Sequence, residues 1–202
     1  MNPDQELTKL ILIGGAYKSG TSVLCRYVES KGYENPAWLS NPNEHGYGIR
    51  VPYYPTRECC KARNFNRLLV DASTRESDLI ERSMAGYIRD LVLAIGPRLV
   101  IKDPYMKLFA GNWMRAANAA GIVSTQLFTT SRNPHDVRKS LENSRFLRKM
   151  QRQYPRVFNV LQSSKVPDVV PAGHHHVIQV FRRQARRNYP GFRSWLHDAW
   201  EP

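Results

Sequence analysis

A short apolar run followed at once by a glycine-rich turn is the feature that most constrains the fold of this chain. The run Leu10–Ile13 is typical of a buried parallel strand. Gly14, Gly15 and Gly20 interrupt it, and from Thr21 onward apolar residues recur on one face of a predicted helix that Gly32 ends. The segment is therefore predicted to form a strand, a tight turn and a helix in direct succession.

The rest of the chain continues the alternation of strands and helices. Residues 33–56 carry four prolines and are predicted to form a long irregular segment, and Ser73 with Glu76 fits a capping box. The predicted strands are 99–101 and 122–130, and the predicted helices run from 74 to near Gly96, over 107–120, over 134–149 and over 177–187. This order favours a single domain over 1–202, a three-layer α/β/α fold with a mainly parallel sheet and a P-loop-like N-terminal unit.

The charge of the chain is strongly positive and unevenly distributed. The 202 residues carry a net charge of +13, and residues 102–202 hold 17 basic against 6 acidic side chains. Such a surface attracts polyanions. No apolar run reaches the ~20 residues of a membrane span, and the first residues lack the profile of a signal peptide. Three cysteines without a metal spacing predict no disulfide framework, so a reducing cytoplasm is the expected location.

The glycine-rich turn is a candidate phosphate-binding loop. Its amides and the helix dipole favour an anion. Magnesium-dependent P-loop enzymes place a lysine directly after the last glycine. Here Thr21 stands in that position, and Lys18 precedes Gly20.

Three motifs, in order along residues 10–145, resemble those of bacterial-type sulfotransferases that use 3′-phosphoadenosine 5′-phosphosulfate (PAPS). Lys18-Ser19-Gly20-Thr21-Ser22 is similar to the loop that binds the 5′-phosphosulfate. Arg132 to Ser140 resembles the 3′-phosphate motif, in which the arginine and the later serine hold the phosphate. Val100 to Pro104 is similar to the motif between the two phosphate sites. The resemblance implies a PAPS-dependent sulfotransferase that releases adenosine 3′,5′-bisphosphate.

The base that would accept the acceptor proton has several candidates. Asp103 closes a predicted strand beside Lys102, which could stabilise developing negative charge, although an Asp-Pro turn is an equally good interpretation of Asp103. Glu44 and His45 lie in a segment that loosely resembles an acceptor loop, and either could replace the glutamate that related sequences carry after their Gly-Tyr pair. The acceptor is expected to be a small molecule or a glycan, and the basic second half points to an acidic one.

Two other functions stay open. A P-loop nucleotide kinase-like enzyme with a deviant loop would need magnesium and an acidic residue such as Asp103. A non-catalytic, basic nucleotide- or nucleic-acid-binding module would explain the charge, but no nucleic-acid-binding motif supports it. His174-His175-His176 is predicted to be a solvated loop, Cys59-Cys60 is predicted to be inert, and no metal site is predicted.

Overall fold

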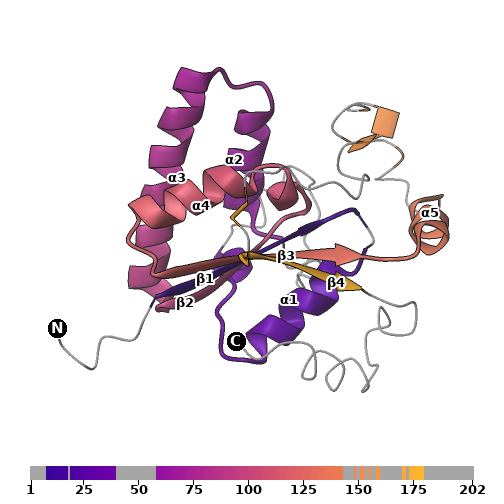
Figure 1. Cartoon of the computed structure of the whole chain (residues 1–202), viewed down its shortest axis with the longest axis horizontal. Coiled ribbons are helices and arrows are strands. Elements are labelled where there is room, and N and C mark those ends of the chain that lie inside the picture. The colour runs from indigo at the N-terminus through magenta and orange to yellow at the C-terminus, as the bar shows by residue number, and fades with distance from the viewer. Residues whose placement is uncertain are drawn as a thin grey trace.

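The computed structural model describes residues 8–17, 19–39, 58–142 and 173–179, with isolated positions at 148, 151, 152, 155, 158, 159, 170 and 171. Figure 1 shows one sheet with helices on both faces. The strands are β1 (Lys9–Gly15), β2 (Arg98–Lys102), β3 (Ser124–Ser131) and β4 (His175–Gln179), in the order β2-β1-β3-β4 and all parallel. The α-helices are α1 (Thr21–Glu29), α2 (Cys60–Val70), α3 (Thr74–Ile95), α4 (Ala110–Ala119) and α5 (Pro134–Glu142), and short 3-10 helices are η1 (Pro36–Leu39) and η3 (Pro104–Lys107).

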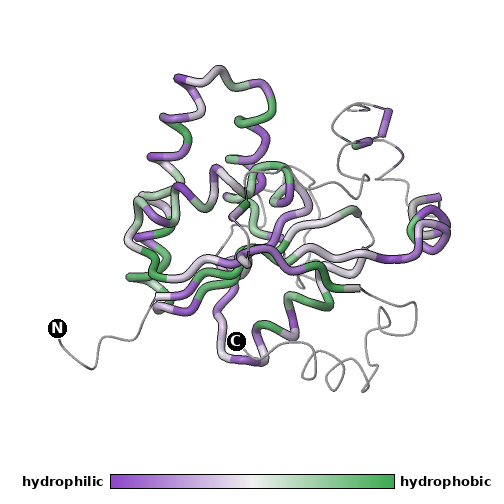
Figure 2. Tube along the Cα trace, in the orientation of Figure 1, coloured by the Kyte–Doolittle hydropathy of each residue, from purple (hydrophilic) through white to green (hydrophobic). Residues whose placement is uncertain are grey.

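The alternation of side chains along β1 divides the core into two layers. Leu10 and Leu12 pack on one face with residues of α2, α3 and α4, whereas Ile11 and Ile13 pack on the other face with α1. All four side chains are 2% exposed or less. In Figure 2, green apolar stretches recur along α1 and along the neighbouring strands. The predicted α/β fold with a parallel sheet is confirmed.

The order in which successive strands are added to the sheet changes side at β1. The chain leaves β1 for β2 on one side and later returns to β3 on the other side, so the carboxyl end of β1 is a topological switch point. Parallel α/β sheets bind ligands outside the carboxyl ends of their strands at such points. The glycine-rich turn occupies this position, because it directly follows β1.

Several local predictions are confirmed. Ser73 and Glu76 form both hydrogen bonds of a capping box, and Pro134 begins α5. The helix expected over 107–120 corresponds to α4, which begins only at Ala110, because Asp103 caps a separate 3-10 turn over Pro104–Lys107.

Two predictions near the C-terminus are wrong. The helix predicted over 177–187 is contradicted at 177–179, which belong to β4, whereas 180–187 lie outside the described residues. The loop predicted for the three histidines is contradicted at His175 and His176, because β4 pairs with β3 from His175 to Gln179. The local pattern misled because β4 is short and lies at the edge of the part of the sheet that the structure describes. No described helix has both the length and the apolar character that crossing a membrane demands.

Candidate functional site

The glycine-rich turn is held in place by contacts that only glycine allows. A Cβ added to Gly14 would lie 2.5 Å from the backbone nitrogen of Lys107 in η3. Gly15 has φ +150°, and a Cβ there would lie 2.8 Å from Oγ1 of Thr130 at the end of β3. The turn is thus packed directly against the segments that follow β2 and β3.

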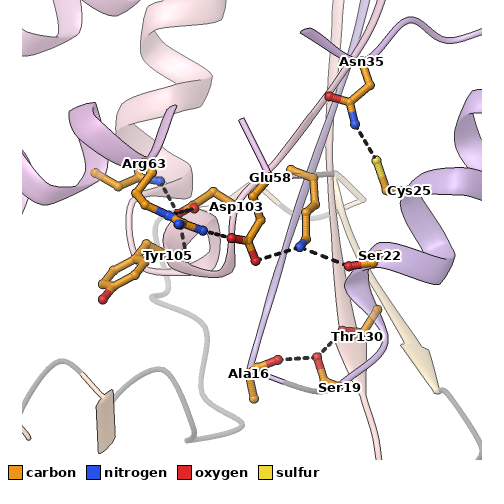
Figure 3. A network of polar contacts seen from close by, with 12 residues as sticks. Ala16, Ser19, Ser22, Cys25, Asn35, Glu58, Arg63, Asp103, Tyr105 and Thr130 are labelled. Carbon is orange, nitrogen blue, oxygen red and sulfur yellow. Dashed lines mark hydrogen bonds and ion pairs between the residues drawn. The ribbon is translucent and has the colours of Figure 1, made fainter. Parts of the chain in front are cut away.

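Ser19 shapes the turn from within. Its Oγ donates to the carbonyl of Ala16 at 2.6 Å and shares a 2.5 Å hydrogen bond with Oγ1 of Thr130 (Figure 3). The side chain of Ser19 is buried, and its backbone N–H also donates to the carbonyl of Ala16, at 3.2 Å, so both of its polar groups have partners within the protein. The hydroxyl ties β1 and β3 together at the switch point.

The helix that follows the turn begins without a side-chain cap. Gly20 is the N-cap residue, with φ 104°, and no acidic residue lies in the first turn of α1. The amide groups at a helix start that no side chain caps can bind an anion, and the helix dipole favours negative charge there. Thr21 and Ser22 form this first turn.

A buried lysine from the end of β2 reaches the same helix start. Nζ of Lys102 lies 3.3 Å from Oγ of Ser22 and 3.1 Å from Oε1 of Glu58. The side chain of Lys102 is 2% exposed. Desolvation by burial lowers the pKa of Lys102 to about 7. Lys102, predicted to stabilise developing negative charge, thus contacts the first turn of α1 through Ser22.

Asp103, the residue next to Lys102, is fully buried and its carboxylate is occupied. Oδ1 accepts from the amide of Tyr105 at 3.0 Å and from Nδ2 of Asn66 at 3.0 Å, and Oδ2 accepts from Nε of Arg63 at 3.2 Å. Figure 3 shows Asp103 and Arg63 side by side. The structure thus places Asp103 in the Asp-Pro turn and in a buried ion pair.

Two further groups lie near the turn. Desolvation lowers the pKa of Lys107 to about 8. The ring of Tyr17, in the turn itself, stacks on Phe158 with centroids 6.1 Å apart and meets Tyr105 edge-on at 6.4 Å. Burial raises the pKa of the Tyr17 phenol far above its usual range, so Tyr17 stays neutral. The aromatic cluster fixes one wall of the turn.

Arg132 follows the end of β3 and precedes α5. Its side chain is 11% exposed, and Nη2 lies 4.0 Å from Oδ2 of Asp136. A mostly buried arginine at a helix start opposes the dipole, which is the arrangement expected where an anion is to be bound. Ser140 lies on α5, two turns farther along. Because α5 begins after the carboxyl end of β3, Arg132 and the turn after β1 lie at the same edge of the sheet.

Other predicted residues fall outside the described part of the chain. Lys18, Glu44 and His45 lie there, as does the side chain of Ser140.

Cys59, His175 and His176 have structural roles. Cys59 caps α2, and burial raises the pKa of its thiol, which agrees with an unreactive side chain. Nε2 of His175 contacts Oγ1 of Thr129 at 2.8 Å, and His176 stacks on Phe128. Among the residues that the structure describes, no group of three or more His, Cys, Asp or Glu side chains could hold a metal ion.

Sequence reasoning missed Glu58 and Arg63. Oε2 of Glu58 pairs with Nη2 of Arg63, while Oε1 of Glu58 faces Lys102. Neither residue belongs to a recognisable motif. Only the folded chain brings them to Lys102, which is more than thirty residues away from each of them in the sequence.

Comparisons with known proteins give the fold. No family model matches the chain, and no curated protein matches it. A sugar kinase from Janibacter sp. HTCC2649 has a TM-score of 0.51 at 12% identity, over 96% of this chain and 94% of that one. A protein provisionally named a kinase, from Chloroflexus aurantiacus J-10-fl, has a TM-score of 0.52 at 10% identity, over 97% of this chain and 100% of that one. The chain shares its parallel α/β fold with these two proteins. At these identities the similarity concerns the fold alone.

Proposed function

We propose that this protein transfers a sulfuryl group from PAPS to a hydroxyl or an amine of an acceptor. The observation that carries the proposal is the contact between the ammonium of Lys102 and Oγ of Ser22. In magnesium-dependent P-loop enzymes, the hydroxyl at this point of the loop faces the ion. Here a side-chain cation faces it, and the neighbouring carboxylate of Asp103 already accepts hydrogen bonds at both oxygens. These residues fit a protein cation better than a magnesium ion.

Sulfuryl transfer suits such a site. The acceptor oxygen or nitrogen forms a bond to sulfur, the bond between sulfur and the 5′-phosphate oxygen breaks, and adenosine 3′,5′-bisphosphate leaves with the electron pair. Lys102 and Lys18 would neutralise the charge that develops on the leaving phosphate. The uncapped start of α1 would bind the 5′-phosphate, and Arg132 with Ser140 would bind the 3′-phosphate.

The acceptor proton needs a base that the acceptor can reach. Asp103 is 0% exposed, so its carboxylate suits the support of the turn better than proton transfer. In this proposal Glu44 or His45 takes the proton.

Kinase activity is the second candidate, because both structural neighbours described above are named as kinases. It predicts magnesium-dependent consumption of ATP and no preference for a 3′-phosphate. Sulfuryl transfer predicts the opposite on both counts.

Calorimetry distinguishes the two candidates. We expect the wild type to bind adenosine 3′,5′-bisphosphate without magnesium and more tightly than adenosine 5′-monophosphate. Lys18→Ala and Arg132→Ala should each weaken binding about tenfold or more, or ~1.4 kcal/mol. Arg138→Ala is the control, since Arg138 lies on α5, which begins two residues after Arg132, but is 83% exposed and pairs with Glu142. The proposal would be overturned if the wild type did not bind adenosine 3′,5′-bisphosphate. It would also be overturned if both Lys18→Ala and Arg132→Ala bound it with the affinity of the wild type.

A further inference from the structure

Glu58 is a carboxylate for which the motifs of the chain provide no role. It precedes α2, and 14% of its side chain is exposed. One oxygen, Oε1, contacts Nζ of Lys102 at 3.1 Å, and the other pairs with Nη2 of Arg63. Figure 3 shows the carboxylate of Glu58 between Arg63 on one side and the ammonium that contacts Ser22 on the other.

The position of Glu58 is fixed from behind by a chain of buried contacts. Nε1 of Trp113 donates to Asn66 at 2.8 Å, and Asn66 donates to Asp103 at 3.0 Å. Asp103 in turn accepts from Nε of Arg63, and Arg63 holds Glu58. Trp113, Asn66 and Asp103 are 0% exposed, so this series of contacts begins in the core. It ends at Glu58, which contacts Lys102 beside the start of α1. A carboxylate held in this way has little freedom to leave Lys102.

The charged and titratable groups that face Lys102 come from several elements. Arg63 of α2 is a like charge, whereas Asp103 and the thiol of Cys25 on α1 favour the protonated amine. Both carboxylate oxygens of Asp103 accept hydrogen bonds from groups other than Lys102. Glu58 is therefore the carboxylate in direct contact with the ammonium among the described residues.

We propose that Glu58 is a positioning residue that keeps Lys102 protonated and directed at Ser22, so that an anionic nucleotide meets a cation at neutral pH. The nucleotide part of this inference rests on the proposed function. The ion pair itself does not, because it involves only side chains of this protein.

The protonated and neutral forms of Lys102 are both populated near pH 7, so a change in the pKa of Lys102 alters its charge at that pH. Burial lowers the pKa of Lys102 to about 7. Removal of a negative charge 3.1 Å from Nζ disfavours the ammonium further, so the pKa should fall in Glu58→Gln. As pH rises through this pKa, Lys102 becomes neutral and anion binding should weaken. In Glu58→Gln the weakening should occur at lower pH.

The first test measures the titration of Lys102 directly by NMR of the protein with isotope-labelled lysine side chains. The resonance that disappears in Lys102→Arg is assigned to Lys102. We expect Glu58→Gln to lower its pKa by about one unit or more, a tenfold change in proton affinity. Glu58→Asp, which keeps the charge, should recover part of the shift.

The matched control is Glu81→Gln. Glu81 is also 14% exposed and also pairs with an arginine, Arg115, but it lies on α3. It should leave the titration of Lys102 unchanged. An unchanged titration in Glu58→Gln, or an equal change in Glu81→Gln, would overturn the inference.

The second test measures the affinity for adenosine 3′,5′-bisphosphate by calorimetry between pH 6 and pH 9. At pH 7, Glu58→Gln should bind about 5–10-fold more weakly than the wild type, and the difference should shrink toward pH 6. If the wild type binds no such nucleotide, the proposed function fails. The NMR titration still tests whether Glu58 keeps Lys102 protonated. If the nucleotide binds but Glu58→Gln shows the wild-type affinity at every pH, the inference fails alone.

Discussion

Gly14 and Gly15 decide how closely the glycine-rich turn approaches its neighbours. The residue after β2 that faces Gly14 is Lys107, whose backbone nitrogen would lie 2.5 Å from an added Cβ. Backbone atoms cannot move aside as the end of a flexible side chain can. The two glycines are therefore required by contacts with η3 and β3, which are distant in the sequence.

Replacement of Gly14 by alanine should destabilise the protein. We expect the free energy of unfolding to fall by ~1–3 kcal/mol, because the new methyl group overlaps the backbone at Lys107. Urea denaturation measures the change. Gly86→Ala is the control of opposite sign: Gly86 lies inside α3 with no atom within 4 Å of an added Cβ, so alanine should stabilise by about 0.5–1 kcal/mol. Equal effects of the two substitutions would contradict this explanation.

Among the elements, α3 and β4 differ in how far local sequence determines them. The start of α3 is fixed by a reciprocal pair: Oγ of Ser73 accepts from the amide of Glu76, and Oε2 of Glu76 accepts from the amide of Ser73. β4 has no comparable local signal. It is a strand because β3 offers it a parallel partner from Leu127 to Ser131.

The capping box of α3 should show a characteristic pH dependence. We expect Ser73→Ala to cost ~1 kcal/mol of the free energy of unfolding at pH 7. Hydrogen bonds from Ser73 lower the pKa of Glu76 in the folded state, so their contribution is present above the unfolded pKa and is lost as pH falls through the folded pKa. The cost should therefore shrink below about pH 4.

Ser83→Ala is the control within the same helix. Oγ of Ser83 donates to the carbonyl of Leu79 and caps nothing. At pH 7 and at pH 3, alanine there should leave the free energy of unfolding unchanged or raise it by roughly 0.3 kcal/mol. A cost that is the same at pH 7 and pH 3 for Ser73→Ala would argue against the role of Glu76.

For the whole molecule, the net charge of +13 affects both stability and ligand attraction. Part of the excess lies on α5, which is mostly hydrophilic in Figure 2 and carries Arg138 and Lys139 on its exposed side. Like charges repel each other more in the compact state than in the unfolded chain. The same field attracts anions in general.

Salt should accordingly stabilise the protein. Between 10 and 150 mM NaCl the Debye length falls from about 30 to about 8 Å, which screens the repulsion. We expect Tm to rise by about 2–4 °C, corresponding to ~1 kcal/mol for a chain of this size. Thermal denaturation followed by circular dichroism measures it. A fall in Tm over this range would show that attractive ion pairs, such as Glu58 with Arg63, outweigh the repulsion.

The sequence by itself determined the features that depend on neighbouring residues. The strand–turn–helix unit at 9–29, the capping box at Ser73 and the start of α5 at Pro134 follow from apolar periodicity, glycine, proline and side-chain capping, all of which act over a few residues. The position of Lys102 at a strand end was visible in the same way.

The tertiary structure alone decided which distant residues meet. It made β4 a strand, buried Asp103 among Arg63, Asn66 and Tyr105, and brought Glu58 to Lys102. No local pattern carries such information, since a strand needs a partner and a buried charge needs a counter-ion, and both are supplied only when the whole chain folds. The motifs predicted a phosphate loop with a nearby lysine, and the folded chain determined the charge and the neighbours of that lysine.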